Sequence, residues 1–256
     1  MMFSKINMYR KIKRIIQPLF IREIHKDSFY LVYNGQLKTW LIIPKNRTYI
    51  YYYGHEENIV NLIKKIVKSF NREPVFFDIG AFIGFYSVLA SKLGCKVYSF
   101  EPDPRSWTLL NLNLRINKLE HHDINIFNVA VGDRTGYIIL QLANVFSESS
   151  ATNYLNKNKI VKRIKVPVIT IDDFITKHKI ERIDIIKIDV EGYGANVING
   201  ALNAISEFRP HIIFEIHRFG QDSEFKTMIL LRNKFDYKIK LIEYRNEKNF
   251  IVYLYQ

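Results

Sequence analysis

The chain has 256 residues, of which 48% are hydrophobic, so it can bury the core of one α/β domain. Its single cysteine, Cys95, excludes an intrachain disulfide and suits a reducing compartment. The sequence contains no run of about 18 apolar residues, so we expect no membrane-spanning helix. The N-terminus is basic but lacks the apolar core and cleavage site of a signal peptide. We therefore expect a cytoplasmic protein.

The formal net charge of +13 is unevenly distributed. Residues 1–72 contain 14 Lys+Arg and 4 Asp+Glu, against 38 and 25 in the whole chain, so the remainder is close to neutral. A basic N-terminal segment can attract an acidic membrane surface, a phosphorylated glycan or nucleic acid, or it can be a plain solvated surface. The sequence leaves these alternatives open and predicts no oligomeric state.

Residues 1–72 are predicted to form a small α+β extension. Residues 1–20 show the imperfect apolar stripe of a short basic helix. Two β-rich runs, 29–33 and 37–43, flank the pair Asn34-Gly35, which is a strong hairpin signal, and a further strand is expected over 48–53. Apolar residues at helical spacing predict a helix over 56–70.

Residues 73–256 alternate between short apolar strands and helices, which is typical of a parallel sheet covered on both faces. The strands are expected over 75–77, 97–100, 123–131, 137–142, 160–168, 183–188, 211–216, 237–242 and 250–255. The helices are expected over 83–93, 104–117, 171–177, 195–205 and 222–234. The last two strands read as a hairpin, which predicts an antiparallel final strand on a mostly parallel, Rossmann-like sheet.

The first strand of this domain leads into a turn that contains Asp78, Gly80 and Gly84. Ligands of open α/β sheets bind beyond the carboxyl ends of the strands, where glycines let them approach the backbone and helix N-termini attract carboxylates. The spacing differs from the Gly-x-Gly-x-x-Gly of dinucleotide sites, which argues against an oxidoreductase. An acid ahead of the glycines suits a cationic amine. The turn therefore indicates S-adenosylmethionine, whose methionyl end carries an amine and a carboxylate.

Two further positions support a nucleoside site. Glu101 ends the second strand, where an acid can accept both ribose hydroxyls. At the end of the third strand, an adenine edge could be read by backbone groups near Ala130 or by the amide of Asn128, although a structural role for Asn128 is an equal alternative.

Four polar groups follow neighbouring strands and are expected to meet in one cleft: Asp189, Glu191, Glu215 and His217. His217 is the preferred general base, because the unperturbed pKa of histidine is near neutral. Asp189 could orient the acceptor, the methyl donor or His217. A less favoured alternative is that Asp189, Glu215 and His217 hold Mg²⁺, which binds through few protein ligands and several waters.

A series of motifs between Phe77 and His217 resembles the FkbM family of methyltransferases. The motifs are 77–84, Phe100-Glu101-Pro102, 128–133, 166–174, 185–192, 197–201 and 214–217. The resemblance implies a class I fold and methyl transfer from S-adenosylmethionine, usually to oxygen, with sugars, glycans and polyketide-type products as acceptors. We expect Asp78, Gly80, Ala81, Gly84 and Asp189 to bind the cofactor. The family usually has Asn where Phe82 stands, and Phe cannot make the hydrogen bonds of that amide.

Other hypotheses remain. A nucleic-acid methyltransferase fits the basic charge, but that charge lies outside the catalytic part. In addition, no Asn-Pro-Pro-Tyr-like segment follows the strand expected over 183–188. A cofactor-binding module without turnover would fit the Phe82 departure. The polar segment 143–158 is either a lid over the acceptor or an ordinary exposed loop.

Overall fold

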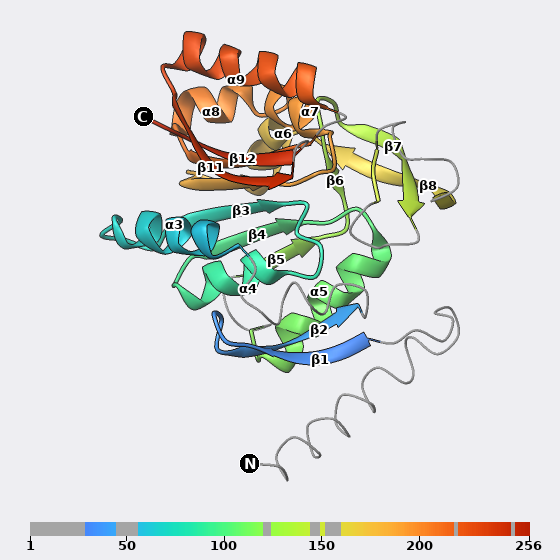
Figure 1. Ribbon diagram of the computed structural model, residues 1–256. Coiled ribbons are helices and arrows are strands. Elements are labelled where there is room, and N and C mark those ends of the chain that lie inside the picture. Colours follow the sequence, from blue (N-terminus) through green and yellow to red (C-terminus); the bar gives the residue numbers. More distant parts are fainter. Residues whose placement is uncertain are drawn as a thin grey trace.

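The structure is a computed structural model that describes residues 29–44, 56–119, 124–143, 149–151, 160–217, 220–246 and 249–256. The helix expected over 1–20 and the strand expected over 48–53 lie outside these residues. Figure 1 shows a central sheet with helices on both of its faces and a small hairpin below. No helix of the described part is long and apolar enough to cross a membrane.

The central sheet has seven strands in the order β11-β12-β10-β9-β3-β4-β5. Their bounds are β3 Val75–Ile79, β4 Lys96–Phe100, β5 Ile124–Phe127, β9 Ile185–Ile188, β10 His211–Ile216, β11 Lys238–Asn246 and β12 Asn249–Tyr255. The five strands from β10 to β5 run parallel, and β12 is antiparallel to both of its neighbours. The predicted class I sheet with an antiparallel final strand is therefore confirmed, and this final strand inserts between β10 and β11.

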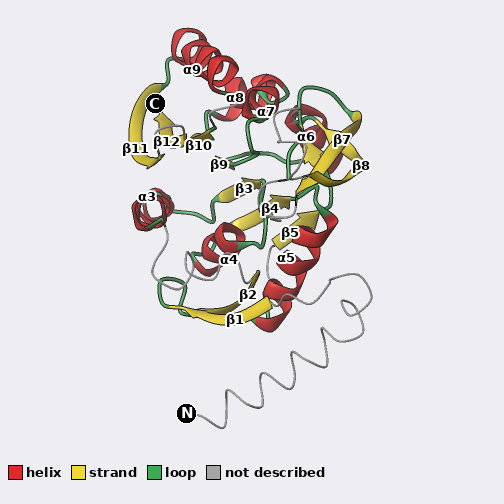
Figure 2. Ribbon diagram, turned by 45° about the vertical axis from the view of Figure 1, so that its right-hand side comes forward, coloured by secondary structure: helices red, strands yellow, loops and turns green. Residues whose placement is uncertain are grey.

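Two hydrophobic cores cover the two faces of this sheet, and Figure 2 shows the helices that lie over each face. The first lies under α3 Glu57–Lys68, α4 Phe85–Lys92 and α5 Pro104–Ile116. The second lies under α6 Ile171–His178, α7 Gly194–Asn199, α8 Leu202–Phe208 and α9 Gln221–Phe235. Since successive side chains of a strand point to opposite faces, every second residue of β3, β9 and β10 faces the α3–α4 side. This periodicity decides which polar groups meet at the carboxyl ends of the strands.

The N-terminal hairpin, β1 Phe29–Asn34 and β2 Thr39–Pro44, packs against α5 rather than standing apart. The predicted hairpin is confirmed, but residues 35–38 form a longer turn than the Asn-Gly pair suggested. The Asn34 side chain accepts a hydrogen bond of 2.9 Å from the Leu37 N–H, which places Leu37 in the turn. The hairpin and α3 contribute to the same core as α4 and α5, so the apolar core is continuous across residue 72.

The strand expected over 123–131 is broken, which corrects the prediction. Its first half is β5, whereas β6 Ala130–Val131 pairs with β8 Ile160–Ile169 in a second sheet of order β6-β8-β7, with β7 at Gly136–Ala143. The break occurs at Asn128, whose side-chain amide donates to the carbonyl oxygens of Glu101 at 2.8 Å and Pro102 at 3.2 Å. These two hydrogen bonds hold the chain at the point where it turns away from β4.

The helix expected over 195–205 is also interrupted. It divides into α7 and α8 at Gly200, where a Cβ atom would lie 1.9 Å from the Gly132 carbonyl oxygen. The carboxylate of Asp172 then accepts hydrogen bonds from Asn203 N at 3.2 Å and Ala204 N at 2.9 Å. These contacts satisfy the free N–H groups at the start of α8, so the interruption is stabilised by packing that periodicity does not reveal.

Candidate active site

The crevice expected at the carboxyl ends of the strands lies where β3 pairs with β4 on one side and β9 on the other. The chain leaves β3 toward β4 and returns to β9, so this is the point at which the strand order reverses. Because β3, β4 and β9 run parallel, the loops that follow them lie at the same end of the sheet, and Figure 1 shows β3 and β4 side by side. The motif residues therefore share one edge, as the sequence predicts.

Gly80 and Gly84 shape the loop after β3. Their φ angles are 79° and 84°, a region that favours glycine. A Cβ atom at Gly80 would lie 1.8 Å from the Asp189 carbonyl oxygen, and one at Gly84 would lie 2.2 Å from Leu110 Cδ1. The glycines were expected to make room for a ligand. That role remains a prediction; in the structure both glycines make room for protein atoms, and Gly80 brings the β3 loop against the start of the β9 loop.

Asp78 is fully buried on the α4 side of β3. One of its carboxylate oxygens accepts a hydrogen bond of 2.6 Å from Ser87 Oγ, and Ser87 Oγ lies 2.8 Å from Ser99 Oγ. The other oxygen, Oδ1, is buried and has no hydrogen-bond partner in the described part of the chain. Burial raises the pKa of Asp78, against the opposing charge of Lys187. Direct contact between Asp78 and a ligand amine remains a prediction.

Glu101 joins the two loops at the crevice. Its carboxylate accepts hydrogen bonds of 2.8 Å from the backbone N–H groups of Phe82 and Asp103. Burial, and then the charge of Asp103, raise the pKa of Glu101 to about 8. Each carboxylate oxygen keeps a second lone pair, so both can still accept ribose hydroxyls. The amide N–H₂ of Asn128, by contrast, bonds to main-chain carbonyls, which supports the structural alternative for that residue.

The four residues expected to meet after β9 and β10 do meet. Nε2 of His217 lies 3.5 Å from Asp189 Oδ1, 3.7 Å from Glu191 Oε2 and 3.6 Å from Glu215 Oε1. Glu215 and His217 are buried, whereas the Asp189 and Glu191 side chains are 28% and 35% exposed. We call these four residues the carboxylate–imidazole cluster. Its exposed carboxylates are the part that an acceptor can reach.

Sequence reasoning did not single out Lys187, which lies beside this cluster. Its side chain is buried, its Nζ donates to Asp189 Oδ2 at 3.1 Å, and the ammonium lies 4.7 Å from the centre of the Tyr86 ring. Burial acts to lower the pKa of Lys187, but the carboxylates of Asp189 and Asp78 outweigh it and hold that pKa above its usual value. The sequence does contain a signal for Lys187, because it is the one charged residue in a strand, β9, that otherwise contains only isoleucine.

Glu224 was also missed, because it lies on α9, outside the motifs, and its burial becomes visible only in the folded chain. It is fully buried and accepts hydrogen bonds from the backbone N–H of His217 at 3.0 Å and of Gly194 at 3.2 Å. Burial raises the pKa of Glu224. The side chain holds the main chain at the His217 end of β10 against the start of α7.

Part of the predicted lid segment is described and lies beside the site. Ser150 Oγ donates to the Glu191 carbonyl oxygen at 2.9 Å, and Ser149 Oγ donates to Asp103 Oδ2 at 2.8 Å. Arg105 also reaches Ser149, at 3.1 Å. Residues 149–151 therefore connect the start of α5 with the β9 loop. The remaining residues of the segment between 144 and 159 lie outside the described part, and lid closure remains a prediction.

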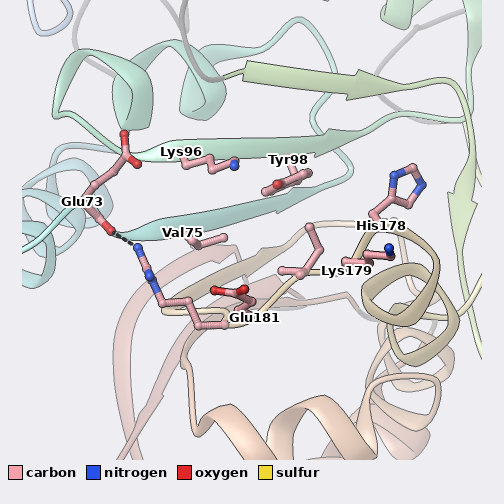
Figure 3. A pocket seen from close by; sticks show the side chains of 9 residues that line it. Glu73, Val75, Lys96, Tyr98, His178, Lys179 and Glu181 are labelled. Carbon is pink, nitrogen blue, oxygen red and sulfur yellow. Dashed lines mark hydrogen bonds between the residues drawn. The ribbon is translucent and has the colours of Figure 1, made fainter.

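A separate cavity of about 330 Å³ lies at the opposite edge of the sheet (Figure 3). Val75 and Lys96, at the amino ends of β3 and β4, line it together with Tyr98, His178 and Glu181. Because it opens at the amino ends of the parallel strands, it is not the crevice that the motifs surround.

The chain is similar to a known family and to solved structures of the same fold. The family model described as "Methyltransferase FkbM domain" matches residues 78–239. The chain belongs to this family. Among solved structures, the FkbM methyltransferase of Methylobacillus flagellatus aligns with a TM-score of 0.53 and 22% identity, over 72% of this chain and 44% of that chain. The same fold is therefore present, although the chain spans less than half the length of that protein.

Three curated methyltransferases are similar to this chain in sequence. Hexuronic acid methyltransferase AglP of Haloferax volcanii is 22% identical over 202 residues, which are 75% of each chain. The 2-O-methyltransferase NoeI of Sinorhizobium fredii is 27% identical over 166 residues, covering 59% of this chain and 64% of that protein. A tRNA (guanine(37)-N(1))-methyltransferase of Candida albicans is 27% identical over 169 residues, covering 64% of this chain and 34% of that protein.

Proposed function

We propose that this FkbM methyltransferase transfers the methyl group of S-adenosylmethionine to a sugar hydroxyl of a glycan or small molecule. The observation that carries the proposal is the position of the carboxylate–imidazole cluster beside the loop of Gly80 to Gly84. One half of the crevice offers a nucleoside site at Glu101, and the other half offers groups that can activate an acceptor. Their proximity is what in-line transfer between two bound molecules needs.

The cluster favours a hydroxyl among the oxygens of a sugar. An alcohol has a high pKa and benefits from a base or a metal ion, whereas a sugar carboxylate is already ionised at neutral pH. AglP and NoeI are named for a hexuronic acid substrate and for 2-O-methylation, which supports a sugar acceptor. In the transfer, the acceptor oxygen bonds to the methyl carbon while the S–CH₃ bond breaks, and S-adenosylhomocysteine leaves with the electron pair.

The cofactor half follows from the same geometry. Glu101 accepts the ribose hydroxyls through its second lone pairs, and the methionyl carboxylate binds at the N-terminus of α4. Asp78, Ala81, Ala130 and Asp189 complete the site as the family motifs predict. The competing hypothesis is a nucleic-acid acceptor, which the tRNA methyltransferase relatives and the net charge of +13 favour.

The test is transfer of radiolabelled methyl from S-adenosylmethionine to a panel of neutral and uronic acid-containing oligosaccharides, with bulk tRNA as the competing acceptor. We expect label in the sugar fraction as a methyl ether, which survives mild alkali, whereas a methyl ester does not. Calorimetry should show S-adenosylmethionine binding, no NADH binding, and at least tenfold weaker S-adenosylmethionine binding in Glu101→Ala. Label in RNA, or alkali-labile label, would contradict the hydroxyl assignment, and lack of S-adenosylmethionine binding would contradict the whole proposal.

A further inference from the structure

The side chain of His217 is only 5% exposed. Nδ1 is buried without a partner in the described part of the chain. Nε2 faces carboxylate oxygens of Asp189, Glu191 and Glu215 at 3.5, 3.7 and 3.6 Å, which is longer than a normal N–H···O hydrogen bond. Nε2 therefore has no close hydrogen bond to these carboxylates, and the arrangement fits a group that binds between the Nε2 atom and the carboxylate oxygens.

The spacing of the surrounding atoms suits a metal ion. One ligand atom each from Asp189, Glu215 and His217 lies within 4.8 Å of the other two. Around an ion with bonds of about 2.1 Å, adjacent ligands of an octahedron are about 3.0 Å apart and opposite ligands about 4.2 Å apart. The Nε2–oxygen distances of 3.5 and 3.6 Å fall between these values. Small side-chain rotations are enough to bring the three atoms onto one ion.

The site is rich in the ligand atoms that a divalent cation prefers. Three carboxylates, those of Asp189, Glu191 and Glu215, converge here, and Lys187 offsets one of them through its contact with Asp189. Carboxylate oxygens suit Mg²⁺ and Mn²⁺, and an imidazole nitrogen favours Mn²⁺ of the two. The ligands are also held in place, because the main chain of His217 is anchored by Glu224 at 3.0 Å.

From this geometry we propose that Asp189, Glu215 and His217 bind one divalent cation of the Mn²⁺ or Mg²⁺ type, which coordinates and activates the acceptor hydroxyl. The role of the ion rests on the proposed function, but the binding site itself does not. The bound hydroxyl loses its proton to solvent through the half-exposed Glu191 carboxylate. Its oxygen then forms the O–CH₃ bond as the S–CH₃ bond breaks, and sulfur keeps the electron pair. In this arrangement His217 acts as a ligand of the ion through Nε2 and not as the general base.

The experiment is Mn²⁺ titration of chelator-treated, full-length protein, followed by the loss of the free Mn²⁺ signal in electron paramagnetic resonance. We expect one bound ion, displaced by excess Mg²⁺, and at least tenfold weaker Mn²⁺ binding in Glu215→Gln. Glu207→Gln, which removes an exposed carboxylate on α8, is the matched control and should bind Mn²⁺ like the wild type. If Glu215→Gln fails to fold, Asp189→Asn serves instead, because Asp189 is 28% exposed.

Two results would overturn the metal assignment while leaving methyl transfer intact. One is wild-type protein that binds S-adenosylmethionine but no Mn²⁺. The other is full methyl transfer in excess chelator that is lost in His217→Asn, which would make His217 a free base. Failure of the proposed function gives a different pattern: Mn²⁺ binds with the expected dependence on Glu215, but no sugar hydroxyl is methylated.

Discussion

The carboxylate of Glu101, at the end of β4, accepts a hydrogen bond of 2.8 Å from the backbone N–H of Phe82, in the loop after β3. This contact joins the two segments that the sequence assigns to the ribose and to the methionyl end of the cofactor. It also explains how a phenylalanine is accommodated where the family usually has asparagine, because the bond uses the backbone of residue 82 and not its side chain.

Phe82 adopts a φ angle of 51°, which is unfavourable for an aromatic residue and tolerated by asparagine. We expect the free energy of unfolding of Phe82→Asn to be on the order of 1 kcal/mol higher than that of Phe82→Ala. Both variants lose the ring, but the Asn variant better tolerates the left-handed backbone. Urea unfolding of the two variants measures the difference. Equal stabilities would show that the backbone conformation at residue 82 carries no cost.

The pKa of Glu101 is raised by burial, and by the charge of Asp103, to about 8 from a value of 4.5. The folded protein therefore binds this proton more tightly than the unfolded chain. The resulting stability is fully present below pH 4.5 and is lost as the pH rises toward 8, by at most about 1.4 kcal/mol per pH unit. Urea unfolding of ligand-free protein at pH 5, 6.5 and 8 should show the stability advantage of wild type over Glu101→Gln shrinking. An advantage that grows with pH would contradict the assignment.

Lys187 is the buried cation that contacts Asp189 and faces Asp78. Lys187→Met should reduce the free energy of unfolding by about 3–5 kcal/mol, because it leaves buried carboxylates without a counter-charge. The matched test is the double variant Lys187→Met with Asp78→Asn, in which one buried charge is removed along with the lysine. The double variant should recover part of the stability that Lys187→Met loses, as measured by thermal unfolding. A double variant no more stable than the single one would argue that Lys187 acts by packing instead.

Asn113 ties the N-terminal hairpin to the cofactor loop. Its buried amide accepts from Ile42 N at 2.6 Å and donates to the carbonyl oxygens of Ile42 at 3.2 Å and Ile83 at 2.8 Å. Asn113→Ala should lower the free energy of unfolding by about 2–3 kcal/mol, since buried backbone groups lose their partners. It should also weaken S-adenosylmethionine binding, because Ile83 lies in the glycine loop.

Asn117, one helical turn later, provides the control for Asn113. Its amide donates to the Trp40 and Asn113 carbonyl oxygens and does not reach the glycine loop. Asn117→Ala should therefore destabilise the hairpin contact while leaving S-adenosylmethionine affinity close to that of wild type. Calorimetry on both variants decides the matter. Equal loss of affinity in the two would mean that the hairpin acts on the site only through overall stability.

The sequence by itself determined the class of sheet and the edge at which the motif residues meet. Apolar strands that alternate with helices can be covered on both faces in few ways, and the two-residue period of a strand places Asp189 with Glu191, and Glu215 with His217, on one face of their segments. These are local regularities, and a single sequence displays them directly.

Only the tertiary structure decided how those residues are used. Close contacts with Asp189 and Leu110 leave no space for a Cβ atom at Gly80 and Gly84. A hydrogen bond from the Asn128 side chain to the Glu101 carbonyl oxygen lies where β5 ends. Glu224 supports His217 from a helix seven residues further on, and Asn113 reaches a strand 71 residues away. Such contacts depend on the shapes of surfaces that meet after folding. Periodicity and composition describe one segment at a time, and so they cannot reveal them.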